Sequence, residues 1–455
     1  MPSLTDTLSQ SDPALQEWID AVKNASSIAL IILAAWELAR RLAVRLVEEE
    51  LAARAQPSTE WPRCPQCETR LESKGPVWRQ LMTLLGPIRW WRRVGRCPNR
   101  CHIGQVAPLD DALGVKPHQR TSIELKQVAC ALAVFVPFET ATALLNRMYT
   151  LQLSPGAVWH WVQEAGQQAM DWLQGELDKL GAGQAPAEEP LDATTATRPL
   201  VMGADGVMVP FRPEKGKPNG RTVWREVKVA ILARLGRRTT QAGQEVPRLE
   251  HRRLVAVLGD IEALRPRLWL EALRQGVRSA KLVAWVCDGG RGFWSLYTAQ
   301  FKGYATGILD FYHAAQNLWK GAAVWLDGRT QAARAWFVTA RHRLRHGETD
   351  QVLADLAAAL ALDDLPASAR TTLTNLYTYL DKHRDHLDYE KFKELGLPIG
   401  SGMVESACKW LIQQRFKGVG MRWSEDGFNH LLHLRLAWVN GRFDALFPLT
   451  LSPNL

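Results

Sequence analysis

Four cysteines in two close pairs are the feature that most constrains the fold of this chain. Two residues separate the first pair and three separate the second, and the stretch between the pairs contains Gly86-Pro87, a turn signal. Four thiolates at this spacing are typical of a zinc ribbon, in which two knuckles joined by a hairpin hold one tetrahedral ion. Because the second pair is one residue longer, the adjacent His102 is an alternative fourth ligand. The four cysteines are Cys64, Cys67, Cys97 and Cys101.

Charge and composition indicate the kind of partner. The formal net charge is +9, which favours an anionic partner, most commonly nucleic acid, although a merely basic protein is the alternative. An odd count of seven cysteines, four of them paired, indicates a reducing compartment. The apolar run Ile28–Trp36 is too short to span a bilayer, and early acidic residues argue against a signal peptide. We therefore expect a cytoplasmic protein without a membrane partner.

The pattern of elements predicts a multidomain α+β protein. Helical spacing over residues 13–55 predicts one long helix, which either binds a partner or packs on its own chain. Three helices near residues 123–136, 138–148 and from 154 onward are compatible with a helix-turn-helix and equally with an ordinary bundle. Residues rich in Gly, Ala, Pro, Thr and Glu follow as a linker. The expected N-terminal divisions are a helical segment (1–58), the zinc ribbon (59–115), a helical DNA-binding domain (116–180) and a linker (181–198).

The second half of the chain changes to strands. Three strands, a helix at Ile261–Gln275, and then strand, helix, strand and helix are the order of an RNase H-like α/β sheet. The expected strands are Pro199–Phe211, Val223–Leu235, Arg253–Leu258, Leu282–Cys287 and Tyr304–Leu309. An all-α insertion then interrupts this core. The expected divisions are the first part of the core (199–326), the insertion (327–396), and the last part of the core with a C-terminal helix (397–455).

Three carboxylates are the candidate catalytic residues. Asp205 interrupts an apolar strand, where an unpaired carboxylate is costly. Asp288 ends a buried-type strand before two glycines, and Glu405 lies in the first turn of a helix opened by Gly400-Ser401-Gly402. Together they would hold two magnesium or manganese ions for in-line displacement at a phosphodiester. The alternatives are turns at the two Asp-Gly sequences and a helix-dipole or Lys409 pairing role for Glu405.

Other residues near these carboxylates are expected to have structural or DNA-binding roles. Asp260 and Asp310 fit helix caps better than metal sites, and Cys408 fits a packing residue better than a nucleophile. Basic and aromatic residues that follow Glu405 are the expected DNA contacts. They are Lys409, Arg415, Lys417, Arg422 and Trp423.

These motifs resemble the insertion-sequence transposases of the ISKra group, which are DDE enzymes. The resemblance rests on Asp205-Gly206-Val207, Cys287-Asp288-Gly289 and Gly400–Ser406, and continues through Asp310-Phe311-Tyr312-His313 and Gly420–Trp423. It covers most of residues 60–440 and implies magnesium-dependent cleavage and strand transfer of double-stranded DNA at the ends of an insertion sequence. It also implies a dimer or higher oligomer on DNA, a bacterial, nucleoid-associated location, and a position for His313 near the active site, in contact with DNA.

Two other functions fit the same motifs. A non-catalytic, domesticated DNA-binding protein would bind DNA without cutting it, although it has no need to keep all three carboxylates. An RNase H-like nuclease would perform the same first chemical step without strand transfer.

Overall fold

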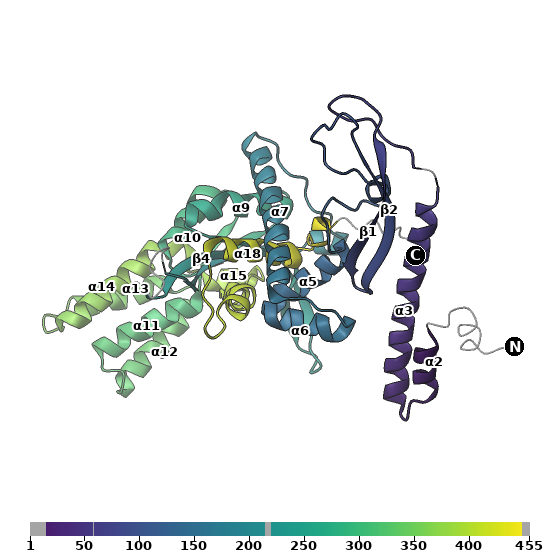
Figure 1. The fold of residues 1–455 in the computed structure, drawn as a ribbon. Coiled ribbons are helices and arrows are strands. Elements are labelled where there is room, and N and C mark those ends of the chain that lie inside the picture. Colours follow the sequence, from purple (N-terminus) through teal and green to yellow (C-terminus); the bar gives the residue numbers. More distant parts are fainter. Residues whose placement is uncertain (1–14, 58, 214–219, 448–455) are drawn as a thin grey trace. The chain divides into compact units, whose positions relative to one another are not determined.

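The computed structural model describes residues 15–57, 59–213 and 220–447, and the first two residues of the helix predicted over 13–55 lie outside them. The protein is a mixed α+β chain that divides into two compact units. One unit is built mainly from residues up to Trp161, and the other spans Val162–Leu446. Figure 1 shows the chain as a ribbon coloured along the sequence.

The N-terminal segment forms two helices, not the single helix that was predicted. α2 (Gln16–Lys23) ends at Asn24, and α3 (Ile28–Ala55) begins after Ser27, whose side chain accepts a hydrogen bond from the Leu30 amide. This N-cap allows the chain to reverse. Leu38 of α3 is buried against α2, so one face of α3 packs on its own chain. Several apolar side chains of α3 remain exposed, including Ile28, Ile32, Trp36 and Leu46.

The cysteine-rich region folds as the expected hairpin. β1 (Glu72–Thr83) pairs antiparallel with β2 (Gly86–Arg96), and Gly86 takes a positive φ of 108° at the turn. The short helix α4 (Pro108–Ala112) follows, and its buried Asp110 accepts hydrogen bonds from Arg79 and Arg92. These bonds tie both strands to α4.

Three helices follow close to the predicted positions. They are α5 (Ile123–Phe135), α6 (Phe138–Tyr149) and α7 (Pro155–Gly181). Pro137 ends the first of them as expected, because proline cannot continue a helix. The third helix is 27 residues long and passes from the first unit into the second.

A five-stranded mixed sheet is the centre of the second unit. Its strands have the order β5-β4-β3-β6-β7; β3 pairs antiparallel with β4 and parallel with β6. The predicted order of strands and helices is present, although β4 and β5 form a longer hairpin than expected. The strands are β3 (Leu200–Phe211), β4 (Val223–Thr239), β5 (Glu245–Leu258), β6 (Val283–Cys287) and β7 (Thr306–Leu309).

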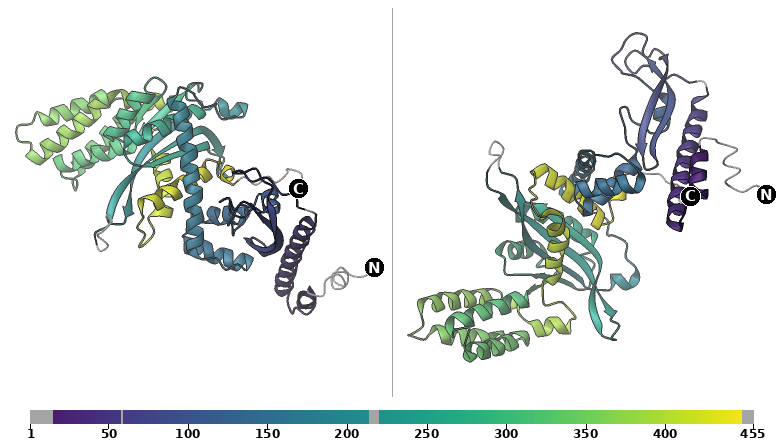
Figure 2. Two further views of the ribbon diagram at one scale, coloured as in Figure 1. Left: turned by 45° about the horizontal axis from the view of Figure 1, so that its top comes forward. Right: turned by 60° about the horizontal axis from the view of Figure 1, so that its bottom comes forward.

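One helix packs on the sheet, and further helices form the insertion. α9 (Ile261–Arg274) packs on β4 and β5, and Asp260 caps it by accepting a hydrogen bond from the Ala263 amide, as predicted. After α11 (Phe311–Trp325), residues 327–396 form helices and no strand. These helices run side by side as a bundle with α11 (Figure 2). They are α12 (Gln331–Arg345), α13 (Thr349–Leu360), α14 (Ala367–Lys382) and α15 (Tyr389–Glu394).

The chain returns to the sheet through α16 (Gly402–Ala407). A π-helical turn (Cys408–Gln413) and α17 (Gln414–Phe416) extend it, and the expected C-terminal helix is α18 (Glu425–Val439), which begins after its cap Ser424. α16 packs against β3 and β4. Within the part of the chain that the structure describes, no helix is long and apolar enough to cross a membrane.

The segment expected as a linker is anchored to the core. After α7 it carries the one-turn helix α8 (Ala193–Ala196), and before that helix the amide of Glu189 donates to the carbonyl oxygen of Arg274. The Glu189 carboxylate accepts hydrogen bonds from Arg253 and Arg442. Burial alone would raise the pKa of Glu189, but these arginines lower it to about 2. The segment is therefore part of the packed structure.

Candidate functional site

Two of the predicted catalytic carboxylates lie at one level of the sheet. β3 pairs in parallel with β6, and the partners Leu200 and Val283 set an offset of 83 residues between the strands. The paired residues of this ladder end at Met202 and Trp285; Asp205 and Asp288 follow at the same offset, and the charge of Asp288 acts on Asp205. β3 runs straight through Asp205, which excludes the turn alternative at that position.

Asp310 extends this row to the next strand. Cys287 of β6 and Leu309 of β7 are the last parallel partners of their ladder, and Asp288 and Asp310 follow them directly. Neighbouring strands lie about 4.8 Å apart. The three aspartates therefore form a row where β6 and β7 end, the kind of edge at which ligands bind in sheets with parallel strands.

Glu405 reaches the row on α16, which packs closely on β3. Gly203 precedes Asp205 by two residues and so lies on the same face of the strand. A Cβ on Gly203 would stand 2.7 Å from the carbonyl oxygen of Val286 and 3.1 Å from Cε of Met403. The absent side chain leaves room beside β6, and Met403 and Val404 of α16 lie over the face that carries Asp205.

Asp310 fixes the start of α16. Its buried Oδ2 accepts a 2.6 Å hydrogen bond from the Ser401 amide and a further bond from the Ser401 hydroxyl. The Phe311 amide also donates to the Ile399 carbonyl oxygen at 2.9 Å. These bonds join the end of β7 to the segment before α16, across the whole helical insertion. Asp310 therefore holds the Gly400-Ser401-Gly402 segment in place.

The other oxygen of Asp310 caps α11, as the sequence predicted. Oδ1 accepts from the amides of Tyr312 at 2.6 Å and His313 at 2.9 Å. Burial acts to raise the pKa of Asp310, but the hydrogen bonds from Ser401 and His313 outweigh it and the pKa is below its usual value. A carboxylate with both oxygens engaged in this way is ionised and held in place.

Asp205 has the opposite electrostatic setting. Burial is the largest influence and raises its pKa, and the negative charges of Asp288 and Glu405 raise it further. The hydrogen bond from the Gly206 amide and the nearby His313 act against this rise. Clustered carboxylates that raise one another's pKa are typical of sites that bind cations, because a divalent ion relieves the repulsion.

Asp310, His313 and Glu405 form a possible metal-ligand group. One ligand atom from each lies within 4.8 Å of the others, and Nδ1 of His313 is 3.4 Å from Oδ2 of Asp310. Asp205 and Asp288 are outside this group, although both act electrostatically in the same site. The oxygen-rich row suits Mg²⁺ or Mn²⁺, which prefer carboxylate ligands, and so fits the expected ion type.

Two residues of the site were missed at the sequence level. Ser401 was read only as part of a helix start, although the Gly-Ser-Gly pattern was the available signal. Tyr379 of α14 had no signal: a Cβ on Gly289 would stand 2.2 Å from its ring, and burial, with Asp288 next, raises the pKa of its hydroxyl. Gly289 therefore makes room for Tyr379 of the insertion.

Cys408 behaves as the predicted packing residue. Its side chain is buried, and burial together with Asp205 and Glu405 raises the pKa of the thiol to about 12. A thiol with so high a pKa stays protonated at neutral pH and is a poor nucleophile.

The expected DNA-binding residues fall into two groups. Lys409, Lys417 and Arg422 are exposed. Arg415 is 1% exposed, because α17 turns its guanidinium inward to within 5.5 Å of the Trp423 ring centre. Trp423 is half-buried and donates its indole N–H to the Phe416 carbonyl oxygen at 2.9 Å. Arg415 therefore packs the core, and its assignment as a DNA contact is corrected on this ground, whereas that of the half-buried Trp423 stays a prediction.

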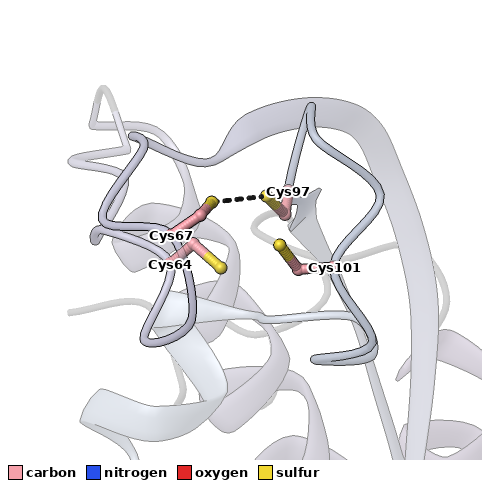
Figure 3. Close-up of side chains that lie close together, drawn as sticks. All are labelled: Cys64, Cys67, Cys97 and Cys101. Atoms are coloured by element: carbon pink, nitrogen blue, oxygen red, sulfur yellow. Dashed lines mark hydrogen bonds between the residues drawn. The ribbon is translucent and has the colours of Figure 1, made fainter.

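The four cysteines converge at the end of the β1–β2 hairpin, opposite its turn. Their sulfurs lie within 4.8 Å of one another, and Sγ of Cys67 is 3.4 Å from Sγ of Cys97 (Figure 3). A tetrahedral ion with zinc–sulfur bonds of about 2.3 Å separates its sulfurs by roughly 3.8 Å, so the cluster fits zinc. Cys101 belongs to the group and the exposed His102 does not.

Each cysteine pair is a tight turn. Glu68 and Arg100 both take positive φ values, of 55° and 56°, and the Glu68 amide donates to the Cys64 carbonyl oxygen. Hydrogen bonds from Thr69 are the largest influence that lowers the pKa of Cys67 to about 6, whereas hydrogen bonds to Cys67 and Cys97 raise that of Cys101 to about 12. One thiol of the cluster is thus already favoured as the thiolate that metals bind.

Comparisons with known proteins identify no family. No family model and no curated protein matches the chain. Among solved structures, the chain is similar to the Drosophila P element transposase strand transfer complex, with 12% identity over 74% of this chain and 83% of that chain. The TM-score is 0.23, a level at which the likeness carries no argument.

Proposed function

We propose that the protein is a DNA transposase of the DDE class with an RNase H-like catalytic core. The observation that carries the proposal is the row of Asp205, Asp288 and Asp310 across three neighbouring strands, with Glu405 brought to it by α16. The strand order β5-β4-β3-β6-β7, with a parallel pairing at β3 and β6, supports an RNase H-like sheet. The resemblance of the motifs to ISKra-group transposases is in accord with it.

The carboxylates have different roles in this proposal. Asp205, Asp288 and Glu405 would hold two divalent ions, which supply a nucleophilic oxygen and stabilise the leaving oxygen of a phosphodiester. Asp310 would keep α16 in place through Ser401, so that Glu405 stays at the site. His313 would sit between Asp310 and the DNA. The exposed Lys409, Lys417 and Arg422 would contact phosphates.

The other parts of the chain would serve DNA recognition. The four-cysteine cluster would hold a structural zinc ion, and α5, α6 and the start of α7 would form the helical DNA-binding domain. Double-stranded DNA at the element ends, and target DNA, would be the substrates. Synapsis of two ends would require a dimer or a higher oligomer.

A cleavage and joining assay tests the proposal. The substrate is labelled duplex DNA from both sides of the gene for this chain, incubated with a supercoiled plasmid and Mg²⁺. We expect nicked substrate and joined plasmid products, and loss of both in Asp288→Asn by on the order of a thousandfold, since metal catalysis contributes several kcal/mol. The matched control is Asp260→Asn, which changes an aspartate that also follows a strand but only caps α9.

The assay also separates the alternative functions. Cleavage without joined products would favour a nuclease. Salt-sensitive DNA binding with no cleavage at any divalent ion concentration would favour a domesticated DNA-binding protein. Cleavage that survives Asp288→Asn would reject the proposed site.

A further inference from the structure

The outer face of the β1–β2 hairpin carries a paired set of exposed tryptophans. Trp78 and Trp91 are direct cross-strand partners, with ring centres 4.5 Å apart and planes inclined by 36°. They are 52% and 48% exposed. The opposite face of the same hairpin buries Ile88 and Trp90. The hairpin therefore buries apolar side chains on one face and exposes an aromatic surface on the other.

Positive charge flanks the tryptophan pair. Arg89 and Arg93 lie two residues on either side of Trp91, so the alternation of the strand puts both on the outer face. Arg89 donates to Gln80 at 2.9 Å, and Arg93 has no ion pair within the described residues. The register partners on this face are Gln80, Trp78 and Pro76, and none is acidic. The surface is aromatic in the middle and has an arginine at each end, and at the Arg89 end the Glu48 carboxylate of α3 accepts a 2.8 Å hydrogen bond from the Arg89 amide.

From this surface we infer that the hairpin binds unpaired bases of a nucleic-acid strand. Indole faces stack on any base, while flanking arginines pair with the phosphates of the same strand. A duplex does not fit, because its bases are already stacked and show only their edges in the grooves. The partner is therefore single-stranded. The inference goes beyond the proposed function and holds whether or not the carboxylate site cleaves DNA.

Cross-strand aromatic packing by itself stabilises a hairpin and needs no ligand. A structural role and a base-stacking role predict different binding behaviour. A merely structural pair leaves nucleic-acid binding independent of the bases, whereas a stacking surface requires them. A strand that lacks its bases but keeps its phosphates is therefore the discriminating probe.

The experiment measures fluorescence anisotropy of two labelled 20-nucleotide strands on the full chain with Asp288→Asn, in zinc-replete buffer without Mg²⁺. One strand is oligothymidylate and the other is its abasic counterpart of equal charge. We expect the chain to bind the normal strand at least tenfold more tightly. In the double variant Trp78→Ala/Trp91→Ala the two strands should bind alike. Trp78→Phe/Trp91→Phe should keep most of the preference.

Two controls guard the result. Trp36→Ala removes an exposed tryptophan from α3, and the preference should be unchanged. Zinc content of each variant reports whether the ribbon is folded, and the single variants replace the double one if it loses zinc. Equal binding of both strands by the Asp288→Asn chain with both tryptophans intact would overturn the inference. A preference that persists without Trp78 and Trp91, or tighter binding of a duplex, would overturn it as well.

Discussion

Two of the aspartates in the row, Asp205 and Asp310, have opposite environments in the fold. Asp205 is crowded by Asp288 and Glu405, which adds to the effect of burial and raises its pKa. Asp310 has both oxygens satisfied by hydrogen bonds, and its pKa is lowered. The first environment suits a residue that awaits a cation, and the second suits a residue that holds other groups in position.

Asp205→Asn should stabilise the metal-free protein while abolishing metal-dependent activity. The folded state raises the pKa of Asp205, so it binds the proton more tightly than the unfolded chain and loses stability as pH rises through the raised pKa. The stability difference between Asp205→Asn and wild type should therefore grow from about pH 4 upward and then level off. Urea unfolding in chelator at several pH values checks this, and a less stable variant at pH 7 would contradict it.

Asp310→Asn should break the link between β7 and α16. One carboxamide cannot accept all of the bonds that Asp310 accepts, because its amino group would face the Ser401 donors. We expect a loss of about 1–3 kcal/mol of stability and a large loss of cleavage. Ser401→Ala, which removes only the hydroxyl bond, should cost about 1 kcal/mol.

Thermal unfolding and cleavage rates measure both variants. If Asp310 acts by positioning α16, the variant that loses more stability should also lose more cleavage activity. Ser401→Ala should then lie between wild type and Asp310→Asn in both measurements. An Asp310→Asn protein of wild-type stability that has lost only metal affinity would indicate instead that Asp310 is a direct ligand.

At the scale of elements, the types of most helices and strands could be predicted from the sequence. The contacts that hold the short motifs in place could not. Strand and helix types in residues 199–326 followed from alternation and caps such as Asp260. The break between α2 and α3 was missed because the helical spacing was taken from the apolar residues on either side, although residues 24–27 are mostly polar and include the cap Ser27. The inward turn of Arg415 was missed since charge suggests a surface position, while α17 places it beside Trp423.

The cysteine cluster allows a prediction that separates two ligands. Cys101→Ala should abolish stoichiometric zinc binding, whereas His102→Ala should keep one zinc per chain, because only Cys101 belongs to the sulfur group. Elemental analysis of the purified variants checks this. The circular dichroism of Cys101→Ala should show a local loss of structure, since a structural zinc site contributes folding energy. Zinc retained by Cys101→Ala and lost by His102→Ala would reverse the assignment.

At the scale of the whole molecule, residues far apart in sequence define the second unit. The row of carboxylates draws on β3, β6, β7 and α16, and a helical insertion of about 70 residues separates the last two. Sequence spacing alone cannot place Tyr379 of that insertion against Gly289. It also cannot anticipate that Glu189, in a segment with linker composition, joins the arginines of β5 and the C-terminal region.

Glu189→Gln should destabilise the second unit by about 2–3 kcal/mol, because Arg253 and Arg442 lose a charged partner. The pKa of Glu189 is lowered to about 2, so its contribution is present above its ordinary pKa and is lost as pH falls toward 2. The stability difference from wild type should therefore shrink below about pH 4.5. Denaturant unfolding at pH 7 and pH 3 measures it, and a constant difference would contradict the account.

The positions of bound metal ions test the central claim most directly. Crystals of the full chain grown with duplex DNA and Mn²⁺ would locate the ions by their anomalous scattering. We predict two manganese peaks, about 4 Å apart, bound by Asp205, Asp288 and Glu405. Peaks held by other residues, with Asp205 and Asp288 unliganded beside bound DNA, would contradict the assignment of this row as the catalytic site.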